Sequence, residues 1–65
     1  MKNNMRLKEL RESKGLTQKH VADVIGYSVL SYARYEKGER EPDIATLKTL
    51  ADYFDVSVDY IIGRN

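Results

Sequence analysis

The stretch from Gly15 to Pro42 constrains the fold more than any other part of this 65-residue chain. Near its middle, Gly26 can adopt the left-handed conformation that ends a helix, because glycine has no side chain to clash there. Two residues later, Ser28 suits an N-cap, since its hydroxyl can accept a backbone N–H that would otherwise lack a partner. Ala22 is small enough for a close helix–helix contact. This order predicts two helices within about residues 17–37 that meet steeply across a short turn.

The length of the chain predicts one small domain over residues 1–65, and such a chain buries only about 60% of its unfolded surface. It has no cysteine, so neither a disulfide nor a thiolate zinc site can stabilise it. A small all-helical fold with mostly local contacts is the natural solution. No apolar stretch approaches the roughly 20 residues of a membrane span, and the start lacks the apolar region of a signal peptide. We therefore expect a cytoplasmic protein with no membrane partner.

Charge is divided unevenly along the chain. Residues 1–40 carry nine Lys and Arg against five Asp and Glu, a net +4, whereas residues 41–65 carry two against five, a net −3. A basic front and an acidic back suit a protein that presents one face to phosphates. A mixed solvated surface is the other explanation, so the asymmetry alone favours nucleic acid only modestly.

Three further helices are predicted around the central pair. Leucines three residues apart indicate a first helix over about 5–14. Pro42 and Asp43 suit the start of a fourth helix, because the missing proline N–H costs little there and the carboxylate can cap. Ser57 is the predicted cap of a short fifth helix, and these last two helices cover about 43–62. The predicted fold class is all-α, with five helices in one compact domain.

Apolar residues at helical spacing predict the buried faces of the second, third and fourth helices. They are Val21, Ala22, Val24, Ile25, Tyr32, Tyr35, Ile44, Leu47, Leu50, Ala51 and Phe54. The second helix has one apolar position more than a buried stripe needs. The outward face of the third helix then consists of Val29, Leu30, Ala33 and Arg34.

The ordered set of turn and helix residues resembles the phage-repressor-like (Cro/repressor, XRE-type) helix-turn-helix transcriptional regulators. The residues that carry the resemblance are Leu16, Thr17, Gln18, Ala22, Gly26, Ser28, Arg34, Tyr35, Glu36, Gly38, Arg40 and Pro42, followed by LADYFDVSVDYIIG from Leu50. The resemblance spans about residues 5–63. It implies a five-helix, lambda-repressor-like DNA-binding domain with the helix-turn-helix in its second and third helices.

This resemblance also implies a function and a set of contacts. The expected protein is a sequence-specific regulator of transcription, a repressor, that places its third helix in the major groove of double-stranded DNA. The base-reading candidates are Arg34, Val29, Leu30 and Ser31, and the phosphate candidates are Gln18, Lys19, Ser28, Lys37 and Arg40. Arg34 is the best base reader, because its forked donors can bond guanine bidentately. For each lysine and for Arg40 ordinary solvation explains the residue equally well, and for Ser28 capping explains it better.

Two structural roles follow from related repressors. They pair an arginine of the first helix with a glutamate that ends the third, which implies a structural ion pair between Arg11 and Glu36. A single helix-turn-helix reads only a few base pairs, so useful specificity normally needs two copies about one DNA turn apart. We therefore expect a homodimer, and the resemblance implies a dimer surface around Val56, Val58, Tyr60 and Ile62.

The third helix departs from the family pattern at its start. Val29 and Leu30 occupy positions where relatives commonly carry polar or basic side chains, and Tyr27 is bulkier than the residue usual at its position. Val29 and Leu30 could contact thymine methyl groups, pack inward if Tyr27 shifts the helix start, or form an apolar patch that binds protein. The last explanation supplies the alternative function, a protein-interaction module of the antitoxin-like or redesigned helix-turn-helix kind.

Other kinds of chemistry find no support in the residues. His20 is the only histidine and the chain has no cysteine, so no metal site and no cofactor are expected. The serines occupy capping positions and no glycine-rich phosphate loop follows a strand, so we do not expect an enzyme. The five tyrosines are interpreted mainly as packing residues.

Overall fold

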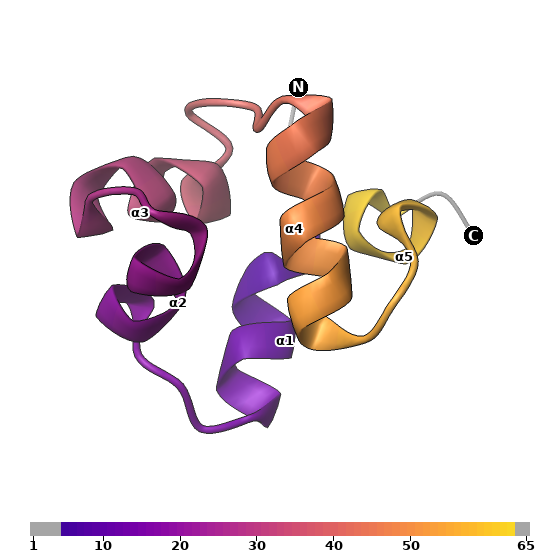
Figure 1. Cartoon of the computed structure of the whole chain (residues 1–65), viewed down its shortest axis with the longest axis horizontal. Coiled ribbons are helices and arrows are strands. Elements are labelled where there is room, and N and C mark those ends of the chain that lie inside the picture. Colours follow the sequence, from indigo (N-terminus) through magenta and orange to yellow (C-terminus); the bar gives the residue numbers. More distant parts are fainter. Residues whose placement is uncertain (1–4, 64–65) are drawn as a thin grey trace.

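The structure is a computed structural model that describes residues 5–63. Five helices follow one another: α1 (Leu7–Ser13), α2 (Gln18–Ile25), α3 (Val29–Lys37), α4 (Ile44–Phe54) and α5 (Val58–Ile62). α3 packs on α2 and α1, while α4 packs on α2 and α5 (Figure 1). No strand occurs within residues 5–63, and none of their helices has the length and apolar character to cross a membrane. The predicted all-α, five-helix fold is confirmed, whereas a domain over all of residues 1–65 stays a prediction, because its ends lie outside the described residues.

Capping residues set the helix boundaries. The side-chain oxygens of four residues each accept the backbone N–H three positions on, as N-caps do: Thr17, Ser28, Asp43 and Ser57. Gly26 and Gly38 end α2 and α3 at φ 78° and 79°, a conformation that glycine adopts without strain. The turn between α2 and α3 therefore forms where it was predicted. Only α1 differs at its start, which is Leu7 and not Met5.

Asp55 is the residue at which capping is least favourable. It ends α4 at φ 59° and ψ 46°, and it is the only non-glycine residue with positive φ in the described part of the chain. A Cβ is strained in this conformation, and a carboxylate is unfavourable at the negative end of a helix. We expect Asp55→Gly to raise the free energy of unfolding by about 1 kcal/mol, measured by urea unfolding. Asp55→Asn removes only the charge and should gain less; an equal gain would contradict a backbone origin.

Ten buried apolar side chains form the core: Leu7, Val21, Ala22, Tyr32, Tyr35, Leu47, Leu50, Ala51, Phe54 and Ile61. Two residues that helical spacing placed in the core are exposed instead, Val24 by 40% and Ile44 by 65%. Val24 is the surplus apolar position of α2. Ile44 lies in the first turn of α4, roughly a quarter turn from the centre of the face that buries Leu50 and Phe54. The prediction that Ile44 is buried is therefore wrong, whereas the exposure of Val24 fits the one surplus apolar position that was predicted for the second helix.

Candidate nucleic-acid interface

One face of α3 is left uncovered by the rest of the fold. Val29 and Leu30 in its first turn are 46% and 61% exposed, and Arg34 one turn later is also exposed. The two tyrosines of α3, on its other face, are buried. The outward face of α3 thus consists of two apolar side chains followed by one forked cation.

Tyr27 fits into the turn without displacing α3. Its ring centroid lies 5.9 Å from that of Tyr35, and its hydroxyl oxygen lies 2.9 Å from Oγ1 of Thr46. Ser28 still caps α3, because its hydroxyl accepts the backbone N–H of Ser31 at 3.1 Å. The explanation in which Tyr27 shifts the helix start and turns the apolar pair inward is therefore wrong. Tyr27 itself is 37% exposed, so the packing interpretation of the tyrosines holds fully for the buried two only.

The two serines of the candidate set are engaged with each other. Ser28 Oγ donates to Ser31 Oγ at 3.1 Å while it accepts the Ser31 N–H. Ser31 is half-buried and Ser28 is exposed. The Ser28 hydroxyl is therefore engaged in capping α3. The Ser31 hydroxyl accepts from Ser28, and its own proton is still available for a hydrogen bond to DNA.

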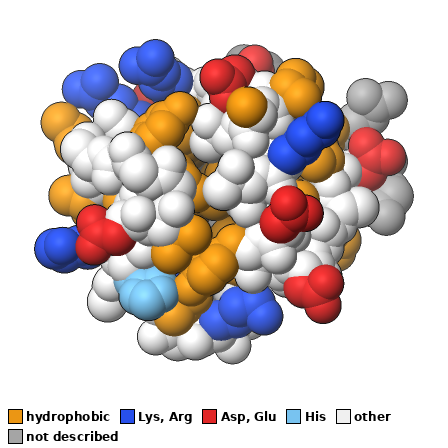
Figure 2. All heavy atoms as spheres, in the orientation of Figure 1, with side chains coloured by type: hydrophobic (Ala, Val, Ile, Leu, Met, Phe, Trp, Pro, Cys, Tyr) orange, Lys and Arg blue, Asp and Glu red, His pale blue; other side chains and the backbone are white. Residues whose placement is uncertain are grey.

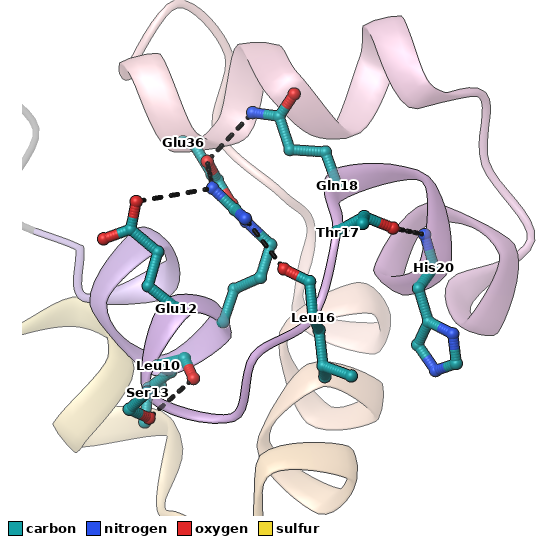
Figure 3. Close-up of polar contacts among 9 residues, drawn as sticks. Leu10, Glu12, Ser13, Leu16, Thr17, Gln18, His20 and Glu36 are labelled. Carbon is teal, nitrogen blue, oxygen red and sulfur yellow. Dashed lines mark hydrogen bonds and ion pairs between the residues drawn. The ribbon is translucent and has the colours of Figure 1, made fainter.

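A buried ion pair connects α1 to the end of α3. Arg11 Nε donates to Glu36 Oε2 at 2.6 Å and Arg11 Nη2 donates to Glu36 Oε1 at 3.2 Å, with side chains 12% and 3% exposed. Arg11 Nη1 also donates to the carbonyl of Leu16 at 2.9 Å. Gln18 Nε2 donates to Glu36 Oε1 at 3.0 Å, and Figure 3 shows this amide facing the carboxylate from the start of α2. Glu36 therefore holds α3 to both α1 and α2.

Hydrogen bonds fix the charges of this cluster. Burial alone would raise the pKa of Glu36, but the hydrogen bonds from Arg11 and Gln18 outweigh burial and hold the pKa below its usual value. The hydrogen bond to Glu36 raises the pKa of the Arg11 guanidinium. Burial, followed by the nearby Glu36 carboxylate, raises the pKa of the Tyr32 hydroxyl. The pair is thus charged and the tyrosine neutral at physiological pH.

An open hollow lies over the ion pair. It is lined by Lys8, Arg11, Leu16, Thr17, Gln18, Glu36 and Lys37. Because Arg11 and Glu36 neutralise each other, the net charge of the lining comes from Lys8 and Lys37, both of which are exposed. The N-terminus of α2, which carries partial positive charge, forms part of the same wall. The hollow is electrostatically suited to an anion such as a phosphate.

Lys8 is a residue that the sequence prediction missed. It precedes Arg11 by three positions and therefore lies on the same face of α1, a spacing that was available in the sequence. Lys19, which was predicted, is not part of the hollow. Its ammonium lies 3.1 Å from Asp23 in an exposed pair with side chains 77% and 65% exposed. Arg40 is exposed in the segment between α3 and α4.

The uneven charge of the sequence has a spatial counterpart. In Figure 2 basic side chains stand above α3 and most acidic side chains lie over the α4 and α5 side, where a basic side chain also lies among them. The acidic residues of the second half are all exposed: Glu41, Asp43, Asp52, Asp55 and Asp59. Within the described part of the chain no three His, Cys, Asp or Glu side chains come together as a metal site would need. His20 instead bonds the Tyr53 hydroxyl through Nε2 at 2.9 Å.

A helix-turn-helix family profile matches residues 7–61, which covers all five helices but the last residue of α5. The chain belongs to this helix-turn-helix family. The XRE-type resemblance inferred from the turn residues is thereby confirmed.

Curated relatives of this helix-turn-helix chain are bacterial and phage regulators. It is 45% identical over 56 residues to YqaE of Bacillus subtilis, an uncharacterised HTH-type transcriptional regulator, covering 86% of this chain and 48% of YqaE. It is 42% identical over 59 residues to the B. subtilis HTH-type transcriptional regulator AnsR, covering 91% and 51%. It is 41% identical over 64 residues to the cryptic phage CTXphi transcriptional repressor RstR of Vibrio cholerae, covering 98% and 57%. The chain spans about half the length of these relatives.

Solved structures agree with this family assignment. A transcriptional regulator from Listeria innocua superposes with a TM-score of 0.85 at 34% identity, covering 89% of this chain and 54% of that one. The P22 c2 repressor, solved with a synthetic operator, gives a TM-score of 0.85 over 92% of this chain and 91% of its own, but its 23% identity shows the fold alone. Because the related proteins are regulators of this DNA-binding family, the expectation that the domain is not an enzyme is confirmed.

Proposed function

We propose that this helix-turn-helix domain binds double-stranded DNA with α3 in the major groove and represses transcription. The observation that carries the proposal is the uncovered face of α3, with Val29, Leu30 and Arg34 outward, next to a hollow flanked by Lys8 and Lys37. The outward residues of α3 can contact base edges, and the lysines beside the hollow can contact phosphates. DNA recognition needs both kinds of contact. The relatives named as transcriptional regulators and repressors support the same role.

Phosphate contacts are assigned to the ends of α2 and α3. Glu36 takes one of the two N–H groups of the Gln18 amide, so the other can donate to a phosphate above the hollow. Lys8 and Lys37 flank the same position, and Arg40, which follows α3, contacts a further phosphate of the DNA backbone. Lys19 contributes less, because it already pairs with Asp23.

Val29 and Leu30 are assigned to thymine methyl groups. Uracil lacks only this methyl group, so replacing a contacted thymine with uracil should weaken binding by about 0.8 kcal/mol, or roughly fourfold, per methyl group. Fluorescence anisotropy measures the change in affinity, on a duplex enriched from a random-sequence DNA library. Uracil at a thymine outside the site is the control, and Leu30→Ser should remove the sensitivity. Equal affinity for every uracil duplex would contradict the assignment.

A homodimer is the proposed active form, with its contact near the end of α4 and α5. Val56, Val58 and Ile62 pack only partly against the core, and Tyr60 is 38% exposed. These residues thus retain apolar surface that a second copy can cover. The alternative function, a protein-interaction module built on Val29 and Leu30, gains nothing from the relatives, whose names are those of transcriptional regulators.

The experiment that tests the proposed function is selection of bound duplexes from a random DNA library at near-physiological salt. We expect enrichment of a palindrome with half-sites about one helical turn apart, and binding that weakens steeply as salt rises. Recovery of unrelated sequences, with binding at low salt only, would rule out sequence-specific regulation. Enrichment of a single half-site would preserve DNA reading and rule out the dimer.

A further inference from the structure

The two ends of α3 are held by side chains from different helices. At its end, Glu36 is bound by Arg11 of α1 and Gln18 of α2. At its start, the residue before the cap, Tyr27, reaches across to Thr46 of α4, and the two hydroxyl oxygens are 2.9 Å apart. If only its C-terminal end were held, α3 could change its angle to the other helices. Contacts at both ends fix its orientation.

We propose that Tyr27 is a positioning residue for DNA reading: its hydrogen bond to Thr46 fixes the start of α3 against α4 and so sets the angle at which α3 enters the major groove. This inference rests on the proposed DNA-binding function. It assigns a role to the bulky residue by which the chain departs from its family. The departure is then a second anchor for α3.

Thr46 is a firm point of attachment. It is buried, at 6% exposure. Its backbone N–H donates to Asp43 Oδ1 at 2.8 Å, so the same residue completes the N-cap of α4. Immediately before this cap lies the segment that carries Arg40. Through Thr46, Tyr27 thus links the base-reading start of α3 to a segment proposed to hold phosphate.

Packing of the Tyr27 ring directs its hydroxyl toward Thr46. The Tyr27 ring rests against the buried Tyr35 at a centroid distance of 5.9 Å, and Tyr35 lies on the inner face of α3. Removing the hydroxyl alone, as in Tyr27→Phe, keeps this ring contact and deletes the bond to Thr46, together with the interaction between the Tyr27 and Tyr35 hydroxyls. Thr46→Val deletes the bond between Tyr27 and Thr46 and keeps both tyrosines, so the two variants together separate positioning from core packing.

The test compares Tyr27→Phe, Thr46→Val and the double variant for affinity to the selected operator and to a random duplex, at a temperature where circular dichroism shows all of them folded. Each single variant should weaken operator binding by about threefold to tenfold, the range expected for one hydrogen bond. The double variant should weaken it no further than Tyr27→Phe does, because the bond that Thr46→Val removes is already absent there. Affinity for the random duplex should stay within about twofold, since non-specific binding depends on phosphates and not on the reading angle.

Tyr53→Phe is the matched control. It deletes a tyrosine hydroxyl that also bridges two helices, through a 2.9 Å bond to His20, but it makes no link to α3. Operator affinity should stay within about twofold of the parent. An equal loss in Tyr53→Phe, or an equal loss of operator and random binding in Tyr27→Phe, would overturn positioning by Tyr27.

Amide hydrogen exchange in the DNA-free protein tests the inference independently of any operator. Tyr27→Phe should speed exchange in the first turn of α3, around Tyr32, and leave the last turn unchanged, because Glu36 still holds that end. Unchanged exchange throughout α3 would overturn the inference. If the parent protein selects no DNA sequence, the proposed function fails by itself, and the exchange result still decides whether Tyr27 anchors α3.

Discussion

Replacing Glu36 with glutamine is expected to lower the free energy of unfolding by about 3 kcal/mol. The substitution keeps the shape of the side chain but removes the charge that Arg11 faces at 2.6 Å, and the guanidinium is left only 12% exposed without a counter-charge. An uncompensated charge in such a place is strongly destabilising. Since small domains have only about 0.05–0.15 kcal/mol of stability per residue, this is a large share of the total. Urea unfolding followed by circular dichroism measures it.

Asp23→Asn is the control for this prediction. It removes the carboxylate of the exposed Lys19–Asp23 pair, whose side chains are 77% and 65% exposed, and should change stability by less than about 0.5 kcal/mol. Replacing Arg11 and Glu36 together with leucine should restore part of the loss, because no buried charge is then stranded. If Glu36→Gln lowers the free energy of unfolding no more than Asp23→Asn does, the buried pair stabilises the domain no more than a surface pair and the prediction is wrong.

The same ion pair predicts how stability depends on pH. The pKa of Glu36 is lower in the folded domain than in the unfolded chain, so its stabilisation is fully present above the unfolded pKa, about 4.3. It is lost as the pH falls through the lower folded pKa, where the folded state also binds the proton. The parent protein should therefore lose stability below about pH 4 more steeply than Glu36→Gln does.

Features decided by neighbouring residues could be predicted from the sequence. A cap needs only a side-chain oxygen and a backbone N–H three positions away, and Thr17, Ser28 and Asp43 all supply one. A helix end needs only a residue that tolerates positive φ, as Gly26 does. These local requirements account for the correct prediction of the helix-turn-helix and of most helix boundaries. They do not depend on how the helices pack.

Features decided by packing could not be predicted in this way. The Gln18–Glu36 and Tyr27–Thr46 hydrogen bonds join residues far apart in the chain, and nothing in the local pattern of either residue indicates its partner. Gln18 was predicted from the resemblance as a phosphate contact, without its bond to Glu36. The exposure of Ile44 likewise depends on which face of α4 the neighbouring helices cover. The Arg11–Glu36 pair was predictable only because related repressors have one.

Replacing Arg34 with alanine is expected to weaken binding to the selected operator by about 1–3 kcal/mol, or roughly 5- to 150-fold. Arg34 is the exposed cation on the outward face of α3, one turn beyond the apolar pair, and its two parallel donors match the two acceptors of a guanine edge. Arg34→Lys should restore little of the affinity, because a single ammonium cannot make both bonds in one plane. Titration against labelled duplex gives the affinities. A repeat selection with Arg34→Ala should lose its preference at one base pair of each half-site.

Arg40→Ala separates base reading from phosphate binding. Arg40 is equally a surface arginine, but it lies after α3, where it is proposed to contact the backbone. Its loss should weaken operator and random duplex alike, reduce the salt dependence by about one phosphate contact, and leave the selected sequence unchanged. If Arg34→Ala behaves in this same uniform way, Arg34 is a phosphate contact and the sequence is read by Val29, Leu30 and Ser31 alone. Only a change in the selected sequence assigns Arg34 to a base, because affinity by itself does not distinguish the two kinds of contact.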